Sequence, residues 1–105
     1  MSWYGARSVY HFGVNSEGLN IFEERVVCIK ADSFKRAHSR ARKEAKEYAE
    51  SNGFDMYPEQ VCYKQGGDKL IKDYEVWSEL FQSNMSLESF YQERYLKYLY
   101  VPEQA

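Results

Sequence analysis

The chain has 105 residues, of which 44 % are hydrophobic and 29 % are charged, and its formal net charge is −2. This length fits one domain over residues 1–105, which can bury roughly 60–70 % of its unfolded surface without a metal or disulfide staple. We expect a cytoplasmic protein with no membrane segment, because no apolar run approaches roughly 18 residues and the N-terminus lacks the basic and apolar regions of a secretory signal.

The first two predicted strands form a hairpin. Residues 3–14 and 19–31 are rich in aromatic and β-branched residues, which favours β-structure. Residues 15–18, with the sequence NSEG, lie between them and favour a turn. A short turn that contains Gly indicates that the two strands pair antiparallel.

An amphipathic helix is predicted for residues 34–50. Asp32 or Ser33 can cap its N-terminus, and Gly53 follows the last periodic residue, as is typical of a helix end. Apolar residues recur at helical spacing and are mostly alanines: Phe34, Ala37, Ala41, Ala45, Tyr48 and Ala49. Small side chains allow the helix to lie close to a sheet.

Two more strands and a second helix complete the prediction. Residues 56–65 form the third strand, in which Pro58 indicates an edge position or a strand start, and residues 69–80 form the fourth. Ser86 can cap a final helix that Pro102 stops. The order ββαββα predicts an α+β fold: a four-stranded antiparallel sheet with the Ala-rich helix packed on one face and a C-terminal helix.

The helix at 34–50 carries a basic face in an acidic chain. Residues 30–46 hold seven basic and two acidic residues, a net charge of +5. Such a face can be a solvated helix side, a contact for an acidic protein, or a phosphate-binding surface. Its candidate partner-binding residues are Lys35, Arg36, Arg42 and Lys46. A second candidate surface is the helical row of Tyr91, Tyr95 and Tyr98, because Tyr is frequent at interfaces.

No pattern for catalysis, a cofactor or a metal is found. His11 and His38 are not spaced as a metal pair, and the chain has no glycine-rich phosphate loop. Glu24 and Arg25 are neighbours on a strand and point to opposite faces, which favours cross-strand ion pairs among Arg7, Arg25 and Glu75 over acid–base catalysis. We therefore predict no catalytic, cofactor-binding or metal-binding residue. The cysteines, Cys28 and Cys62, are expected to be free strand residues in the core.

Several motifs together resemble one family. They are WYGAR in the first strand, FEERVVCIKADS in the second, EAKEYAE at the end of the first helix, YEVWSEL, and SLESFYQERY near the C-terminus. The chain resembles the domain-of-unknown-function 4288 family over nearly its whole length. The matching positions are Trp3, Tyr4, Arg7, Glu23, Glu24, Arg25, Ala31, Ala45, Tyr48, Glu75, Val76, Trp77 and Ser78. The resemblance implies a small bacterial single-domain protein, brings no activity, and carries these residues over as fold determinants.

These observations predict a non-enzymatic protein-binding module. Its most specific form is an immunity or antitoxin-like protein that neutralises a bacterial toxin by direct binding, since such inhibitors use charge complementarity and aromatic anchors. One alternative is a nucleic-acid-binding regulator that uses the basic helix 34–50. Another is a homo-oligomeric structural protein, for example a homodimer, that pairs through a sheet edge or through the face of Tyr91, Tyr95 and Tyr98.

Overall fold

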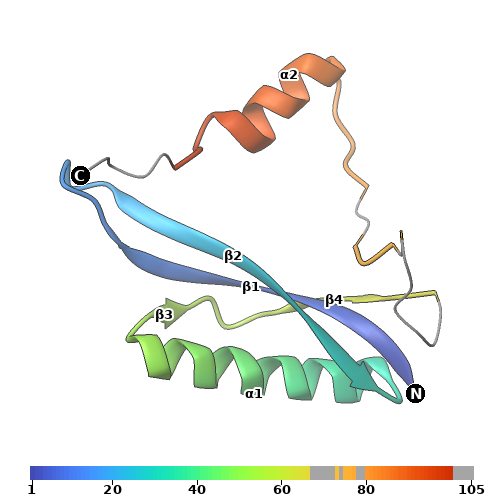
Figure 1. Ribbon diagram of the computed structural model, residues 1–105. Coiled ribbons are helices and arrows are strands. Elements are labelled where there is room, and N and C mark those ends of the chain that lie inside the picture. Colours follow the sequence, from blue (N-terminus) through green and yellow to red (C-terminus); the bar gives the residue numbers. More distant parts are fainter. Residues whose placement is uncertain (67–72, 74, 78–79, 101–105) are drawn as a thin grey trace.

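The computed structural model describes residues 1–66, 73, 75–77 and 80–100. The elements run β1 (Ser2–Val14), β2 (Asn20–Ala31), α1 (Phe34–Asn52), β3 (Asp55–Met56), β4 (Val61–Lys64) and α2 (Leu87–Tyr91). A π-helical turn, η1 (Gln92–Leu96), continues α2. The predicted α+β class and the order ββαββα are confirmed (Figure 1).

Strand β1 is the centre of a four-stranded antiparallel sheet. On one side it pairs with β2 along the whole hairpin, with Val9 opposite Glu24. On its other side it pairs with β4 near its start and with β3 near its end. The hairpin register shifts between His11 and Gly13. The outer edge of β2 has no strand partner among the described residues.

Helix α1 covers one face of the sheet, as its alanine stripe predicts. Ala37, Ala41, Ala45 and Ala49 are all buried. They pack against side chains of alternate β1 and β2 residues, of which the buried ones are Tyr4, Ala6, Tyr10, Ile29 and Ala31. The methyl side chains bring the helix close to the sheet, so the large rings of the core come from the strands.

Both ends of α1 follow the expected capping chemistry. The Ser33 hydroxyl accepts a hydrogen bond from the backbone N–H of Arg36 at 3.1 Å. Gly53 has φ of 70°, a left-handed conformation that glycine adopts without cost from a Cβ. Of the two residues proposed as N-cap, Ser33 is therefore the one used.

The last two strands differ in position from the prediction. The predicted strand 56–65 is split into β3 and β4, because Pro58 lies between them and has no N–H for a ladder. Residues 75–77 and 80, from the predicted strand 69–80, are not β-structure. The other residues of that predicted strand, apart from Asp73, lie outside the described part of the chain. The sheet is four-stranded because one predicted strand supplies two.

The face of the sheet opposite α1 is only partly covered. We call it the outer face; its residues on β2 are Phe22, Glu24, Val26, Cys28 and Lys30. Trp77 lies on its β1 side, close to Gly5 and with its ring 5.4 Å from the Arg7 guanidinium. Residues 80–100, which we call the C-terminal arm, place α2 on this side, across the sheet from α1 (Figure 1). None of the helices in the described part of the chain combines the length and apolar character needed to cross a membrane.

Candidate interaction surfaces

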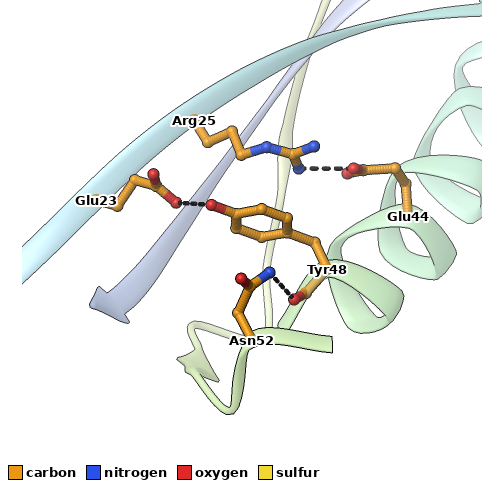
Figure 2. A network of polar contacts seen from close by, with 5 residues as sticks. All are labelled: Glu23, Arg25, Glu44, Tyr48 and Asn52. Atoms are coloured by element: carbon orange, nitrogen blue, oxygen red, sulfur yellow. Dashed lines mark hydrogen bonds and ion pairs between the residues drawn. The ribbon is translucent and has the colours of Figure 1, made fainter. Parts of the chain in front are cut away.

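A polar cluster joins β2 to α1 on the covered face of the sheet (Figure 2). The Arg25 guanidinium lies 2.6 Å from the Glu44 carboxylate and 3.8 Å from the centre of the Tyr48 ring. The Tyr48 hydroxyl donates to Glu23 at 2.7 Å. The Asn52 amide donates to the Tyr48 carbonyl at 2.9 Å. Two strand residues, Glu23 and Arg25, are thereby tied to two residues of α1, Glu44 and Tyr48.

The charged groups of this cluster pair with one another and hold α1 against the sheet. Burial lowers the pKa of Arg25, but the hydrogen bond and charge of Glu44 outweigh it, so the net pKa is raised. The hydrogen bond to Glu23 raises the pKa of Tyr48. Cross-strand ion pairs were predicted among Arg7, Arg25 and Glu75; of these residues, Arg25 pairs instead with Glu44 on α1. Glu23, Arg25 and Tyr48 serve the packing of the helix on the sheet.

The basic face of α1 points away from the sheet. Lys35, Arg36, Arg42 and Lys46 are all exposed. Arg36 lies 3.7 Å from Asp32, and Arg40 donates to the backbone carbonyl of Lys30. A shallow depression of about 580 Å³ lies at the start of α1, with Lys35, Arg36 and Arg40 among its lining residues. Part of the positive charge is thus neutralised locally, whereas Lys35, Arg42 and Lys46 form no ion pair with any described residue.

The C-terminal arm holds Tyr91 and Tyr95 of the predicted tyrosine row on its helical part, and Tyr98 in the turn that follows. The Tyr91 and Tyr95 ring centres lie 5.1 Å apart in a tilted contact, and Tyr98 is 83 % exposed. No residue from 80 to 100 is buried. Ten large apolar or aromatic side chains in this stretch are exposed: Leu80, Phe81, Met85, Leu87, Tyr91, Tyr95, Leu96, Tyr98, Leu99 and Tyr100. One ion pair, between Arg94 and Glu24 at 3.8 Å, connects the arm to the outer face.

The two predicted surfaces are not brought together. The basic face lies on α1 and the tyrosine row lies across the sheet from it (Figure 1). The structure adds a third surface that sequence reasoning missed, the outer face, where Phe22 is 66 % exposed and Val26 is 48 % exposed. Cys28 lies on it as an exposed thiol, so its assignment to the core is wrong. The sequence of residues 20–31 does not alternate between apolar and polar residues, because both sides of β2 mix charged and apolar side chains. The pattern therefore could not reveal this face.

The histidines and acidic residues form no metal site within the described residues, where no group of three His, Cys, Asp or Glu side chains is placed to hold an ion. Nε2 of His11 lies 2.8 Å from Oδ1 of Asn20, and its ring packs edge-on to Phe22 at 5.8 Å. His11 is therefore part of the packing at the end of the hairpin.

No curated protein and no solved structure matches the chain. The family described as "Domain of unknown function (DUF4288)" matches residues 3–67. This range contains β1 to β4 and α1, with the polar cluster of Glu23, Arg25, Glu44 and Tyr48. The match is shorter than the motif resemblance suggests, since Trp77 and the C-terminal arm lie beyond it. The chain belongs to the DUF4288 family, with its sheet and first helix inside the shared region and its arm outside.

Proposed function

We propose that this chain is a non-enzymatic, cytoplasmic protein-binding module that presents its C-terminal arm to another protein. The observation that carries the proposal is that the arm exposes ten large apolar or aromatic side chains and buries none. Large exposed apolar surfaces on soluble proteins mark interaction sites. The sheet and α1 act in this view as a rigid base for the arm.

The chemistry of the arm suits a groove on a protein partner. Leu87, Tyr91 and Tyr95 recur every four residues along α2 and η1, and the exposed Tyr98 follows two residues after η1 ends, so it extends this stripe. Tyr and Arg residues dominate the energetic centres of protein interfaces, because they combine large contact area with a polar end. The stripe supplies three Tyr, and Arg94 is the neighbouring cation.

The specific role that we propose within this class is neutralisation of a toxin by direct binding, as in immunity or antitoxin proteins. Its support is the separation of charge and apolar surface on the chain. The net charge of residues 30–46 is +5, against −2 for the whole chain. Such a charge pattern steers association and selects partners, while buried aromatic anchors supply affinity.

Affinity capture from the native lysate tests the binding proposal. The arm variant replaces Tyr91, Tyr95 and Tyr98 by Ser, and the matched control replaces Lys35, Arg42 and Lys46 by Glu; all six residues are exposed. We expect one protein to be retained by the wild type and lost with the arm variant. The control should still retain it but with slower association, because the basic face steers the encounter while the aromatic anchors supply the affinity. Retention by the arm variant, or no retained protein at all, would overturn the proposal.

Growth of cells that express the captured protein tests the specific role. We expect this protein to slow growth alone, and co-expression of the wild-type chain to restore growth. The arm variant should not restore growth, because it cannot bind. A captured protein without any effect on growth would refute toxin neutralisation and leave a different binding role.

A second candidate is nucleic-acid binding by α1. The observation that favours it is the exposed row of Lys35, Arg42 and Lys46, which lie seven and four residues apart on one helix side and form no ion pair with described residues. Binding through phosphate contacts falls steeply with salt, because counterions are released. Titrations with duplex and single-stranded DNA and RNA at low salt test it. A flat response, or binding that survives the Glu variant, would refute it.

A further inference from the structure

We infer that two copies of this chain pair through the open edge of β2, antiparallel, with Val26 opposite Cys28 of the second copy and Glu24 opposite its Lys30. The pairing extends the sheet of each copy across a two-fold axis. It does not depend on the proposed function, because its backbone hydrogen bonds come from β2 and not from the C-terminal arm. Glu24 also pairs with Arg94 of the arm at 3.8 Å, so its carboxylate serves both contacts.

The backbone of β2 is oriented for this pairing. The N–H of Gln65 donates to the Trp3 carbonyl and the N–H of Tyr57 donates to the Val9 carbonyl, both at 2.9 Å. Trp3 and Val9 thus direct their backbone groups away from β2. Their opposite residues on β2 are Lys30 and Glu24. In an antiparallel pair, opposite residues exchange both hydrogen bonds or none.

Glu24 and Lys30 therefore point their N–H and C=O groups to the open edge. The register is regular between them, so Val26 and Cys28 point the same way. Among the described residues, no backbone group of another segment bonds to this edge. The Lys30 carbonyl accepts from the Arg40 side chain but keeps a second lone pair. A 12-residue strand with an unpaired edge is a template for another strand.

Charge complementarity selects the second copy and one register. With Val26 opposite Cys28, each Glu24 lies opposite a Lys30, so the symmetry gives two opposite-charge pairs. A shift of two residues in one direction places Glu24 opposite Cys28, and in the other direction opposite Asp32, another carboxylate. The side chains are accessible, since Glu24 is 53 % exposed and Lys30 is exposed.

The pairing also covers apolar surface on the outer face. Opposite residues share one face of the sheet, so Val26 and Cys28 of the two copies form a cluster of four side chains at the two-fold axis. Val26 is 48 % exposed and Cys28 is exposed in the single chain. The other candidate occupant, a strand of a different protein, would not use this self-complementary charge pattern.

Sedimentation equilibrium of the full chain tests the inference. The monomer mass is 12.5 kDa, and we expect twice this mass with rising concentration. Lys30→Glu or Glu24→Lys should each raise the dimer Kd about tenfold or more, because two attractive pairs become repulsive. The double variant Glu24→Lys with Lys30→Glu restores opposite charges and should restore the dimer. Lys64→Glu, an exposed charge on β4, is the matched control and should change nothing.

A backbone variant keeps the test independent of charge. Val26→Pro removes an N–H that points to the open edge and leaves the ladder with β1 intact, so the monomer should retain its circular dichroism and lose the dimer. A monomer up to about 1 mM, the weak end of measurable association, would overturn the inference. So would a dimer that survives Val26→Pro, or a double charge variant that stays as weak as the single variants.

Discussion

Replacing Gly5 by Ala should loosen the contact between Trp77 and the outer face. Gly5 is buried near the start of β1 and is not one of the glycines with positive φ, so its backbone accepts alanine. A Cβ at this position would lie 2.9 Å from Cε3 of Trp77 and 3.0 Å from the carbonyl oxygen of Val76. Glycine is required here by close approach and not by conformation.

The size of the effect follows from the overlap. Carbon atoms attract best at about 3.5–4.0 Å, so the new methyl group lies roughly 0.5 Å or more too close to Cε3 of Trp77, and it also crowds the Val76 carbonyl oxygen. Overpacking of this kind costs about 1–3 kcal/mol. Alanine recovers about 0.5–1 kcal/mol relative to glycine in a strand, because it loses less entropy on folding. We expect Gly5→Ala to lower the free energy of unfolding by about 1–2 kcal/mol.

Urea unfolding and tryptophan emission measure this. Trp3→Phe serves as the background, so that emission reports Trp77 alone, and Gly5→Ala should shift it to longer wavelength as the ring moves into water. In a Trp77→Ala background the cost of Gly5→Ala should fall by about 1 kcal/mol, since contacting residues are energetically coupled. Part of the cost remains, because the Val76 carbonyl is still close. The same loss of unfolding free energy on Gly5→Ala with and without Trp77, or unchanged Trp77 emission, would refute the explanation that Gly5 is required by the close approach of Trp77.

Two other substitutions and one alkylation experiment test the packing and chemistry of the region that the family shares. Ser33→Ala removes the hydroxyl oxygen that accepts a hydrogen bond from the Arg36 N–H, and urea titration should show the free energy of unfolding lowered by about 1 kcal/mol. An unchanged free energy of unfolding would show that this cap does not stabilise the helix. Ala45→Leu should lower the free energy of unfolding by about 1–3 kcal/mol, because Ala45 is fully buried beside Tyr10. A smaller loss than that of a variant with Leu at an exposed position of α1 would contradict this packing. Burial raises the pKa of Cys62, so mass spectrometry should find exposed Cys28 alkylated first near neutral pH, and faster Cys62 reaction would contradict this. Because the folded pKa of Cys62 is raised, its contribution to stability is complete at low pH and is lost as the pH rises through that pKa.

Local patterns predicted the first half of the fold well. The alanine stripe located the buried side of α1, and Ser33 and Gly53 located its ends, because capping and helical period depend on neighbours in the chain. The hairpin followed from two β-rich segments and a turn. These features involve residues that interact within a few positions of one another.

The parts that depend on distant contacts were not predictable in the same way. Arg25 has possible partners on several elements, and only the register of β2 beneath α1 selects Glu44. Val76 and Trp77 have strand-like composition, but they lie across Gly5 instead of entering the sheet. The outer face was missed because its apolar residues alternate with the polar cluster on the same strand. The helical period of the arm was visible, whereas its lack of buried residues was not.

Hydrogen–deuterium exchange of the isolated chain tests most directly the claim that the arm is a presented surface. If the sheet and α1 are folded and the arm is not packed on them, amides of α1 and β1 should exchange slowly. Amides of residues 87–96 should exchange much faster, because their local opening costs little free energy. Exchange in residues 87–96 as slow as in α1 would contradict the account, because the arm would then be part of the folded core and its side chains would have partners within the chain.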